Sequence, residues 1–213
     1  MKKISLLAII TILLISCNKS EEGLEKATVF EKSVENQDII KLQALFQSKE
    51  FSNFDEVLSF SESLVTGADT KMRSVENIEI SEEALSVVEK MQNIQVDTES
   101  SPEVYRNELN KILDDSDLDK NSSEYQALAI SIEATIAAIN YKMQLDMPEF
   151  HTRGFWSKAW AAVKCVGGTA GSAGLGALAG AGVGTMTVPV IGTVSGTALG
   201  GWSGALVGVA TFC

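Results

Sequence analysis

The apolar positions along the chain form two patterns, one before and one after Pro148. Before it, apolar residues recur at helical spacing between charged and polar ones, as in the series Leu128, Ile132, Ile136, Ile139 and Met143. This spacing puts the apolar side chains on one face of a helix. Beyond the proline the chain is mostly apolar or small, and residues 165–213 include no charged side chain. The sequence predicts an all-α fold, with an acidic helical bundle followed by an apolar helical hairpin.

Local signals mark the helix ends between residues 26 and 147. Asn53, Ser81 and Ser101 each precede a periodic segment in the N-cap position. Ser122 or Ser123 is expected to begin the longest helix, which Pro148 ends, because proline cannot continue a helix. We therefore expect residues 26–147 to form an antiparallel bundle around one core.

Glycine recurs at every fourth position in the apolar part. The residues concerned are Gly176, Gly180 and Gly184 in one run and Gly192, Gly196, Gly200, Gly204 and Gly208 in the next. Glycine inside a helix costs about 1 kcal/mol relative to alanine, so the two runs predict close helix packing. Each four-residue step advances the stripe by about 40° around the helix, which predicts a right-handed crossing or several neighbours. We expect several hairpins to assemble through this stripe into a homo-oligomer.

Residues 185–189 separate the two runs of glycines and are expected to form the turn of the hairpin, with Pro189 beginning the second arm. The arms, residues 165–184 and 190–212, each reach roughly 30 to 35 Å as helices, which matches a hydrocarbon core about 30 Å thick. The sequence therefore predicts that the hairpin packs in a lipid membrane. Packing of the hairpin within the protein itself is the alternative.

Aromatic and basic residues precede the first arm. Trp156, Lys158, Trp160 and Lys164 fit a membrane interface, where rings and ammonium groups lie at headgroup depth. A tryptophan-rich helix docked on the core of the bundle explains the same residues.

The N-terminal residues 1–17 have the pattern of an export signal, in which two lysines precede an apolar run. The run ends in Leu14-Ile15-Ser16-Cys17, which resembles the lipobox of bacterial lipoproteins. The resemblance implies that Cys17 is lipidated and begins the mature protein, followed by a polar tether at residues 18–25. No aspartate follows the cysteine directly, which favours the outer membrane or the cell surface. An ordinary cleaved signal is the alternative.

Two further cysteines, Cys165 and Cys213, remain once Cys17 is assigned to lipid. Outside the cytoplasm such a pair is expected to be oxidised. An antiparallel hairpin brings both to the same end, where a disulfide would close it. Two buried free thiols are the alternative.

Charge is divided unevenly along the chain. All 28 acidic residues lie between Glu21 and Glu149, whereas Arg153, Lys158 and Lys164 are the only charged residues after that. The acidic body argues against nucleic-acid binding. The abrupt change in composition predicts a linker at residues 148–154 between two separate units, 26–147 and 155–213.

Candidate catalytic and metal-binding residues are few. His151 is the only histidine and lies in the expected linker, so it is interpreted as exposed rather than catalytic. Asp115, Asp117 and Asp119 alternate as in a calcium loop, but Lys120 stands where that loop needs glycine. We therefore predict a non-enzymatic protein without a metal or other cofactor.

Two families resemble the apolar part. Residues 167–208, with the lipobox, resemble the glycine-zipper two-helix domain of small envelope lipoproteins. This implies an envelope lipoprotein whose hairpin inserts in or packs at a membrane and self-associates. From Gly154 onward the chain is also similar to glycine-rich, membrane-permeabilising bacteriocins, with Arg153 as a candidate processing site. That resemblance implies an antibacterial pore-forming toxin with the acidic helices as its inhibitory pro-region.

Overall fold

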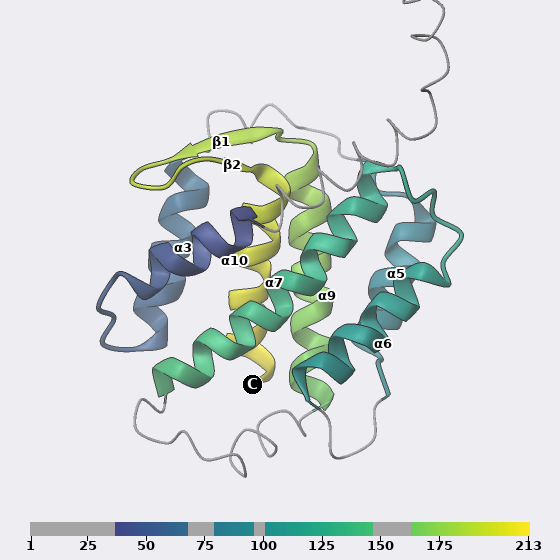
Figure 1. Cartoon of the computed structure of the whole chain (residues 1–213), viewed down its shortest axis with the longest axis horizontal. Helices are drawn as coiled ribbons and strands as arrows, with labels where there is room; N and C mark the ends of the chain where they lie inside the picture. Colours follow the sequence, from purple (N-terminus) through teal and green to yellow (C-terminus); the bar gives the residue numbers. More distant parts are fainter. Residues whose placement is uncertain (1–36, 68–78, 96–100, 147–162) are drawn as a thin grey trace, which may run out of the picture. The chain divides into compact units, whose positions relative to one another are not determined.

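Helices account for most of the described residues, which are 37–67, 79–95, 101–146 and 163–213 of a computed structural model (Figure 1). In chain order the elements are a helix at residues 37–47, α3 (Phe54–Gly67), α5 (Glu82–Gln92), α6 (Pro102–Asp114), α7 (Ser123–Asp146), α9 (Val163–Ala181), β1 (Thr185–Val188), β2 (Gly192–Ser195) and α10 (Gly196–Phe212). The predicted all-α class is confirmed, with one short β-ribbon added.

Short polar side chains begin the helices of the acidic part. Ser81 and Ser101 each accept a hydrogen bond from the backbone amide three residues ahead, at the start of α5 and α6. Asn53 accepts one in the same way at the start of α3. These bonds satisfy amides that lack a partner within the helix, so the predicted caps are confirmed.

The long helix α7 packs mainly against α9, α10 and α6 and also touches α5. In Figure 1 it crosses in front of both arms of the C-terminal hairpin. Its buried apolar residues therefore lie on more than one face and include Leu128, Ile130, Ile132, Ala134, Ile136 and Ile139. The predicted stripe is buried except for Met143, which is only partly buried, and the additional residues are buried because α7 is enclosed on several sides.

The hairpin consists of α9 and α10 joined by a β-ribbon rather than by a short turn. The strands β1 and β2 are antiparallel and pair Thr185 with Ser195 and Val188 with Gly192. The prediction that Pro189 begins the second arm is wrong, because α10 starts only at Gly196. The reason lies in the residues on both sides of Pro189, since Thr and Val favour strands and β1 alternates between exposed and buried positions.

The core contains side chains from both parts of the sequence. The Trp202 ring of α10 lies 5.5 Å from the Phe46 ring and 6.2 Å from the Tyr141 ring, measured between centroids. Helices of the acidic part and the hairpin belong to one compact unit, Glu35–Cys213. The expected separation into two units is therefore not observed, because the apolar hairpin supplies the surface against which the amphipathic helices bury theirs.

Candidate functional site

The two arms of the hairpin touch through backbone atoms at paired glycines. A side chain on Gly176 would collide with the carbonyl oxygen of Gly200, and one on Gly200 would collide with that of Gly176. Gly180 and Gly196 show the same reciprocal relationship one helical turn away. Glycine is required at these four positions because any side chain would force the arms apart.

The stripe continues along the rest of α10. Gly204 faces the carbonyl oxygen of Ser172, and Gly208 faces the Cα atom of Thr169. One neighbour, α9, therefore meets the whole stripe of α10. A repeat of four residues exceeds the 3.6 residues of a helical turn, so continuous contact along it favours a right-handed crossing, one of the two predicted arrangements.

Two of the predicted packing glycines do not lie between helices. Gly184 follows α9 and Gly192 lies in the ribbon, with φ of +75° and +81°, and no atom lies within 4 Å of a side chain built on either. Their role as packing residues was predicted wrongly. They serve the chain reversals at the ends of the ribbon, where the left-handed conformation favours glycine.

A second glycine stripe, absent from the sequence-based prediction, faces α5. A side chain on Gly167 or Gly171 would collide with Gln92, and one on Gly174 would lie 3.1 Å from Val88. The spacing of four and then three residues places all three glycines on one helical face. The signal was present in the sequence but was hidden by the more regular four-residue repeat.

A disulfide closes the end of the hairpin opposite the ribbon. The structure joins Cys165 and Cys213, whose Cα atoms lie 4.7 Å apart. Cys165 is buried and Cys213 is exposed. The Phe212 ring lies over Gly168, where a side chain would collide with it. Ribbon, glycine contact and disulfide thus close the hairpin at both ends and along its length.

Polar contacts also tie the hairpin to the acidic helices around it. The backbone amide of Ser195, which caps α10, donates to the Oδ2 atom of Asp38 at 2.8 Å. The other carboxylate oxygen of Asp38, which is 4% exposed, accepts a hydrogen bond from Lys41 at 2.8 Å. Ser61 of α3 donates to Ser203 of α10 at 2.9 Å. A buried carboxylate therefore stabilises the N-terminal end of α10, where the helix dipole favours negative charge.

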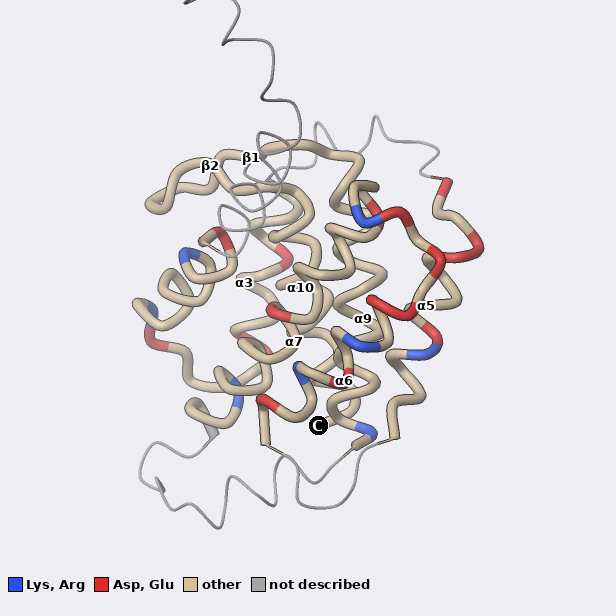
Figure 2. The backbone as a smooth tube through the Cα atoms, turned by 45° about the vertical axis from the view of Figure 1, so that its right-hand side comes forward, with Lys and Arg blue, Asp and Glu red and all other residues tan. Residues whose placement is uncertain are grey.

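Part of the hairpin surface remains open. Leu175 of α9 and Val207 and Phe212 of α10 are 42%, 54% and 48% exposed. Because residues 165–213 carry no charged side chain, this open face is neutral. Figure 2 shows that acidic and basic residues lie over the helices of residues 37–146, whereas β1, β2 and α10 are free of charge. The neutral open face is the candidate functional surface.

The arms are shorter than the sequence suggested. α9 has 19 residues and α10 has 17, so α10 extends about 25 Å, less than a hydrocarbon core about 30 Å thick. Among the described residues, no helix combines the length and the apolarity that crossing a membrane requires. The ribbon takes up the residues that would have lengthened both arms.

Several predicted site residues lie outside the described ranges. These are Cys17, His151, Arg153, Trp156, Lys158 and Trp160. Lys164, the remaining residue of the predicted membrane interface, is exposed in the first turn of α9. The structure therefore describes the hairpin and the helices around it, whereas lipidation at Cys17 and processing at Arg153 remain predictions.

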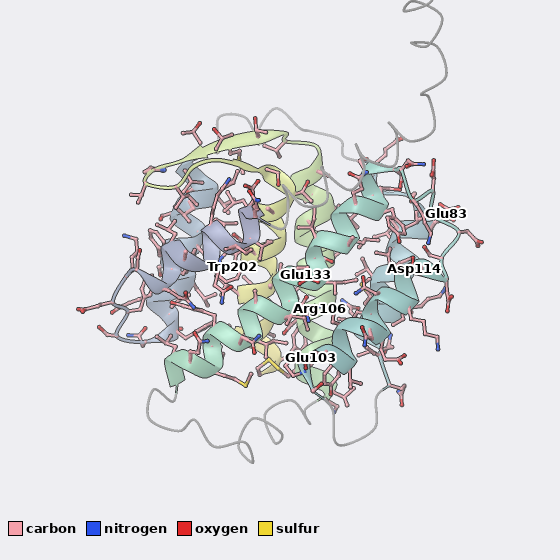
Figure 3. All side chains as sticks on the ribbon, viewed as in Figure 1. Glu83, Glu103, Arg106, Asp114, Glu133 and Trp202 are labelled. Atoms are coloured by element: carbon pink, nitrogen blue, oxygen red, sulfur yellow. A yellow bond between two sulfur atoms is a disulfide. The ribbon has the colours of Figure 1, made fainter. Side chains whose placement is uncertain are left out.

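Some charged groups of the described helices form structural contacts. Arg106 of α6 donates to Glu133 of α7 at 3.0 Å (Figure 3). Hydrogen bonds from its own backbone amide and from Ser101 lower the pKa of the Glu103 carboxyl at the start of α6. Among the described residues, no three His, Cys, Asp or Glu side chains are grouped to hold a metal ion. These groups stabilise helix ends and helix pairs.

Comparison with known proteins found no matching family model, curated protein or solved structure.

Proposed function

We propose that this protein is a non-enzymatic lipoprotein of the cell envelope, anchored by lipid on Cys17, whose hairpin packs at a membrane. The hairpin carries no charged side chain beyond Lys164, and its open face carries Leu175 and Val207, both more than two-fifths exposed. Transfer of apolar side chains from water to the boundary between headgroups and acyl chains lowers the free energy. This neutral open face is the observation that carries the proposal.

Packing at the surface fits this hairpin better than crossing the bilayer. The inner faces of both arms are already buried by the acidic helices, through side chains such as Leu178 and Trp202. The open face can meet lipid while these contacts remain. A second copy that packs on the helices of the hairpin would have to use the same open face, because the other arm already fills the four-residue glycine stripe. Self-association and membrane contact would therefore compete.

Vesicle flotation of the full chain tests this proposal. The Cys17→Ala substitution removes the lipid anchor, so differences among variants in binding to neutral phospholipid vesicles then report on the protein surface. Glutamate at both Leu175 and Val207 should abolish most of this binding, because a charged group resists transfer from water.

The matched control puts two glutamates on helices outside the hairpin. Ile40 and Val104 are exposed apolar residues, 63% and 39% accessible. Ile40→Glu with Val104→Glu adds the same charge and should bind like the parent. Equal binding by both double variants would contradict the proposal.

A second function is favoured by the way in which the hairpin is closed. The glycine contacts between the arms, the ribbon and the disulfide all lie within residues 165–213. Cleavage after Arg153 would therefore release a segment that keeps its own closure. In this alternative the released segment is a bacteriocin-like toxin that permeabilises the membrane of a competitor, and the acidic helices are its inhibitory pro-region.

The toxin hypothesis has a direct test. The oxidised peptide of residues 154–213 should release dye from liposomes and kill related bacteria, whereas the full chain should do neither. Replacing Cys165 and Cys213 with serine tests whether closure is needed for this activity. A peptide that is inert in both assays would exclude the toxin and would leave the membrane-packing proposal intact.

A further inference from the structure

A cavity of about 380 Å³ lies beneath the turn of the ribbon. One wall comes from the ribbon and its turn, and the other from α3 and the end of the helix at residues 37–47. Its lining residues are Leu45, Lys49, Phe60, Ser63, Leu64, Thr187, Val188, Pro189 and Val190. The volume falls within the range of small-molecule sites, roughly 300 to 1,000 Å³, and is too small for a helix about 10 Å across.

The cavity combines an apolar wall with one cationic group. Leu45, Phe60 and Leu64 supply aliphatic and aromatic surface, while the Nζ atom of Lys49 lies 4.6 Å from the centroid of the Phe60 ring. Among the described residues, no carboxylate forms an ion pair with Lys49. An ammonium group held at the edge of apolar surface suits a ligand with an apolar chain and a single negative charge.

The turn above the cavity has an unusual backbone. Val190 has φ of +81° and is 92% exposed. A β-branched residue rarely adopts this conformation, which is sterically unfavourable. Burial of its side chain does not compensate for this cost. Such strain is typical of segments that contact ligands, and here the strained residue lines the cavity.

We propose that this cavity binds one long-chain fatty acid, with the chain against Leu45, Phe60 and Leu64 and the carboxylate on Lys49. The site is separate from the open face of the hairpin, and the inference does not depend on the proposed membrane function. Because the ribbon lines one wall of the cavity and α3 lines the other, a bound fatty acid would link the hairpin to the helices that pack around it. It would stabilise the folded state, since it binds that state alone.

Displacement of a fluorescent fatty acid, cis-parinaric acid, from the full Cys17→Ala chain tests this inference. Oleic acid should displace the probe about tenfold more effectively than oleyl alcohol, which lacks the carboxylate. A short-chain phosphatidylglycerol, with two chains and a bulky headgroup, should compete weakly. In the Lys49→Gln variant the preference for the acid over the alcohol should disappear.

A pair of substitutions on α3 distinguishes fatty-acid binding in this cavity from nonspecific binding elsewhere on the surface. Ser63 is exposed and lines the cavity, whereas Ser59 is exposed on the same helix and does not line it. Ser63→Trp should fill the cavity and weaken probe binding at least tenfold, and Ser59→Trp should leave binding unchanged. Oleic acid should also raise the midpoint of thermal unfolding of the parent and not of Ser63→Trp.

Each of three results would overturn the inference. These are absence of saturable probe binding to the parent, equal loss in both tryptophan variants, and an acid preference that persists in Lys49→Gln. Circular dichroism of each variant checks that the helices remain folded. The vesicle flotation experiment is unaffected by any of these outcomes, so failure here and failure of the membrane proposal are distinguishable.

Discussion

The carbonyl oxygen of Gly200 occupies the space that a side chain on Gly176 would need. The reverse is also true, so the two arms of the hairpin touch through their backbones. Backbone atoms cannot rotate away from a new side chain as a flexible side chain can. The glycine stripe is therefore a contact within one chain. A glycine-to-alanine substitution, which adds a single methyl group, tests how closely the two backbones approach.

Gly200→Ala should lower the free energy of unfolding by about 1 to 3 kcal/mol, because the added methyl group overpacks the contact. Gly201, the next residue, is a matched control, since its added Cβ atom would lie at ordinary contact distances, 3.4 Å from the Ala177 Cβ atom and 3.7 Å from that of Ala134. Gly201→Ala should be neutral or stabilising by up to about 1 kcal/mol through helix propensity. Urea unfolding measures both, and equal stability of the two variants would refute the backbone contact.

Reduction of the disulfide should destabilise the protein strongly. Cys165 and Cys213 are 48 residues apart in sequence, and a loop of this length contributes about 4 kcal/mol in the chain-entropy treatment. The comparison uses Cys17→Ala with and without reductant, followed by urea unfolding. Cys165→Ser with Cys213→Ser is the control and should not respond to reductant. An unchanged midpoint on reduction would contradict a closed hairpin.

Local signals in the sequence were sufficient to predict the helix starts, because a cap depends on a few adjacent residues. Asn53, Ser81 and Ser101 all occupy the predicted position. The ribbon was missed because Gly192 continues the four-residue spacing of α10 although it lies outside that helix. Spacing alone cannot distinguish a glycine needed for packing from one needed for a positive φ.

The surroundings of the hairpin could not be predicted from its composition. Lipid tails are as apolar as the leucine and isoleucine side chains of a protein core, so a neutral hairpin suits either. Here Leu128 of α7 and Val88 of α5 lie against α9 at Gly174. The second glycine stripe becomes recognisable only with these partners in place, because its spacing resembles that of any helical face.

Trp202 is fully buried, and its indole Nε1 atom has no hydrogen-bond partner among the described residues. Figure 3 shows it on the hairpin, within the core. An unpaired buried donor destabilises the folded state by about 1 to 3 kcal/mol. Replacing Trp202 with phenylalanine removes this penalty, which offsets the packing lost with the smaller side chain. Trp202→Phe should therefore change the free energy of unfolding by less than about 1 kcal/mol, whereas Trp202→Ala should lower it by about 3 to 5 kcal/mol. Equal losses would indicate that the indole N–H is satisfied.

Alkaline pH should destabilise the protein through Tyr125. Burial and a hydrogen bond to Asp114 raise the pKa of Tyr125 from 10.0 to about 12. Between these values the unfolded chain loses a proton that the folded chain keeps, so stability falls as pH rises from about 10 to about 12. Tyr125→Phe should show a shallower fall in urea unfolding across this window. Burial also raises the pKa of Tyr141, but this residue is present in both proteins and does not affect the comparison. Parallel curves would contradict the assignment to Tyr125.

The most direct test of membrane packing places an environment-sensitive dye on the open face of the hairpin. Val207→Cys, labelled with a nitrobenzoxadiazole dye in the Cys17→Ala chain with its disulfide intact, should brighten and shift to shorter wavelength when neutral vesicles are added. The same dye at Val104→Cys on α6, an exposed position outside the hairpin, should not respond. A Val207 dye that stays in water, or equal responses at both positions, would contradict packing of the hairpin at a membrane.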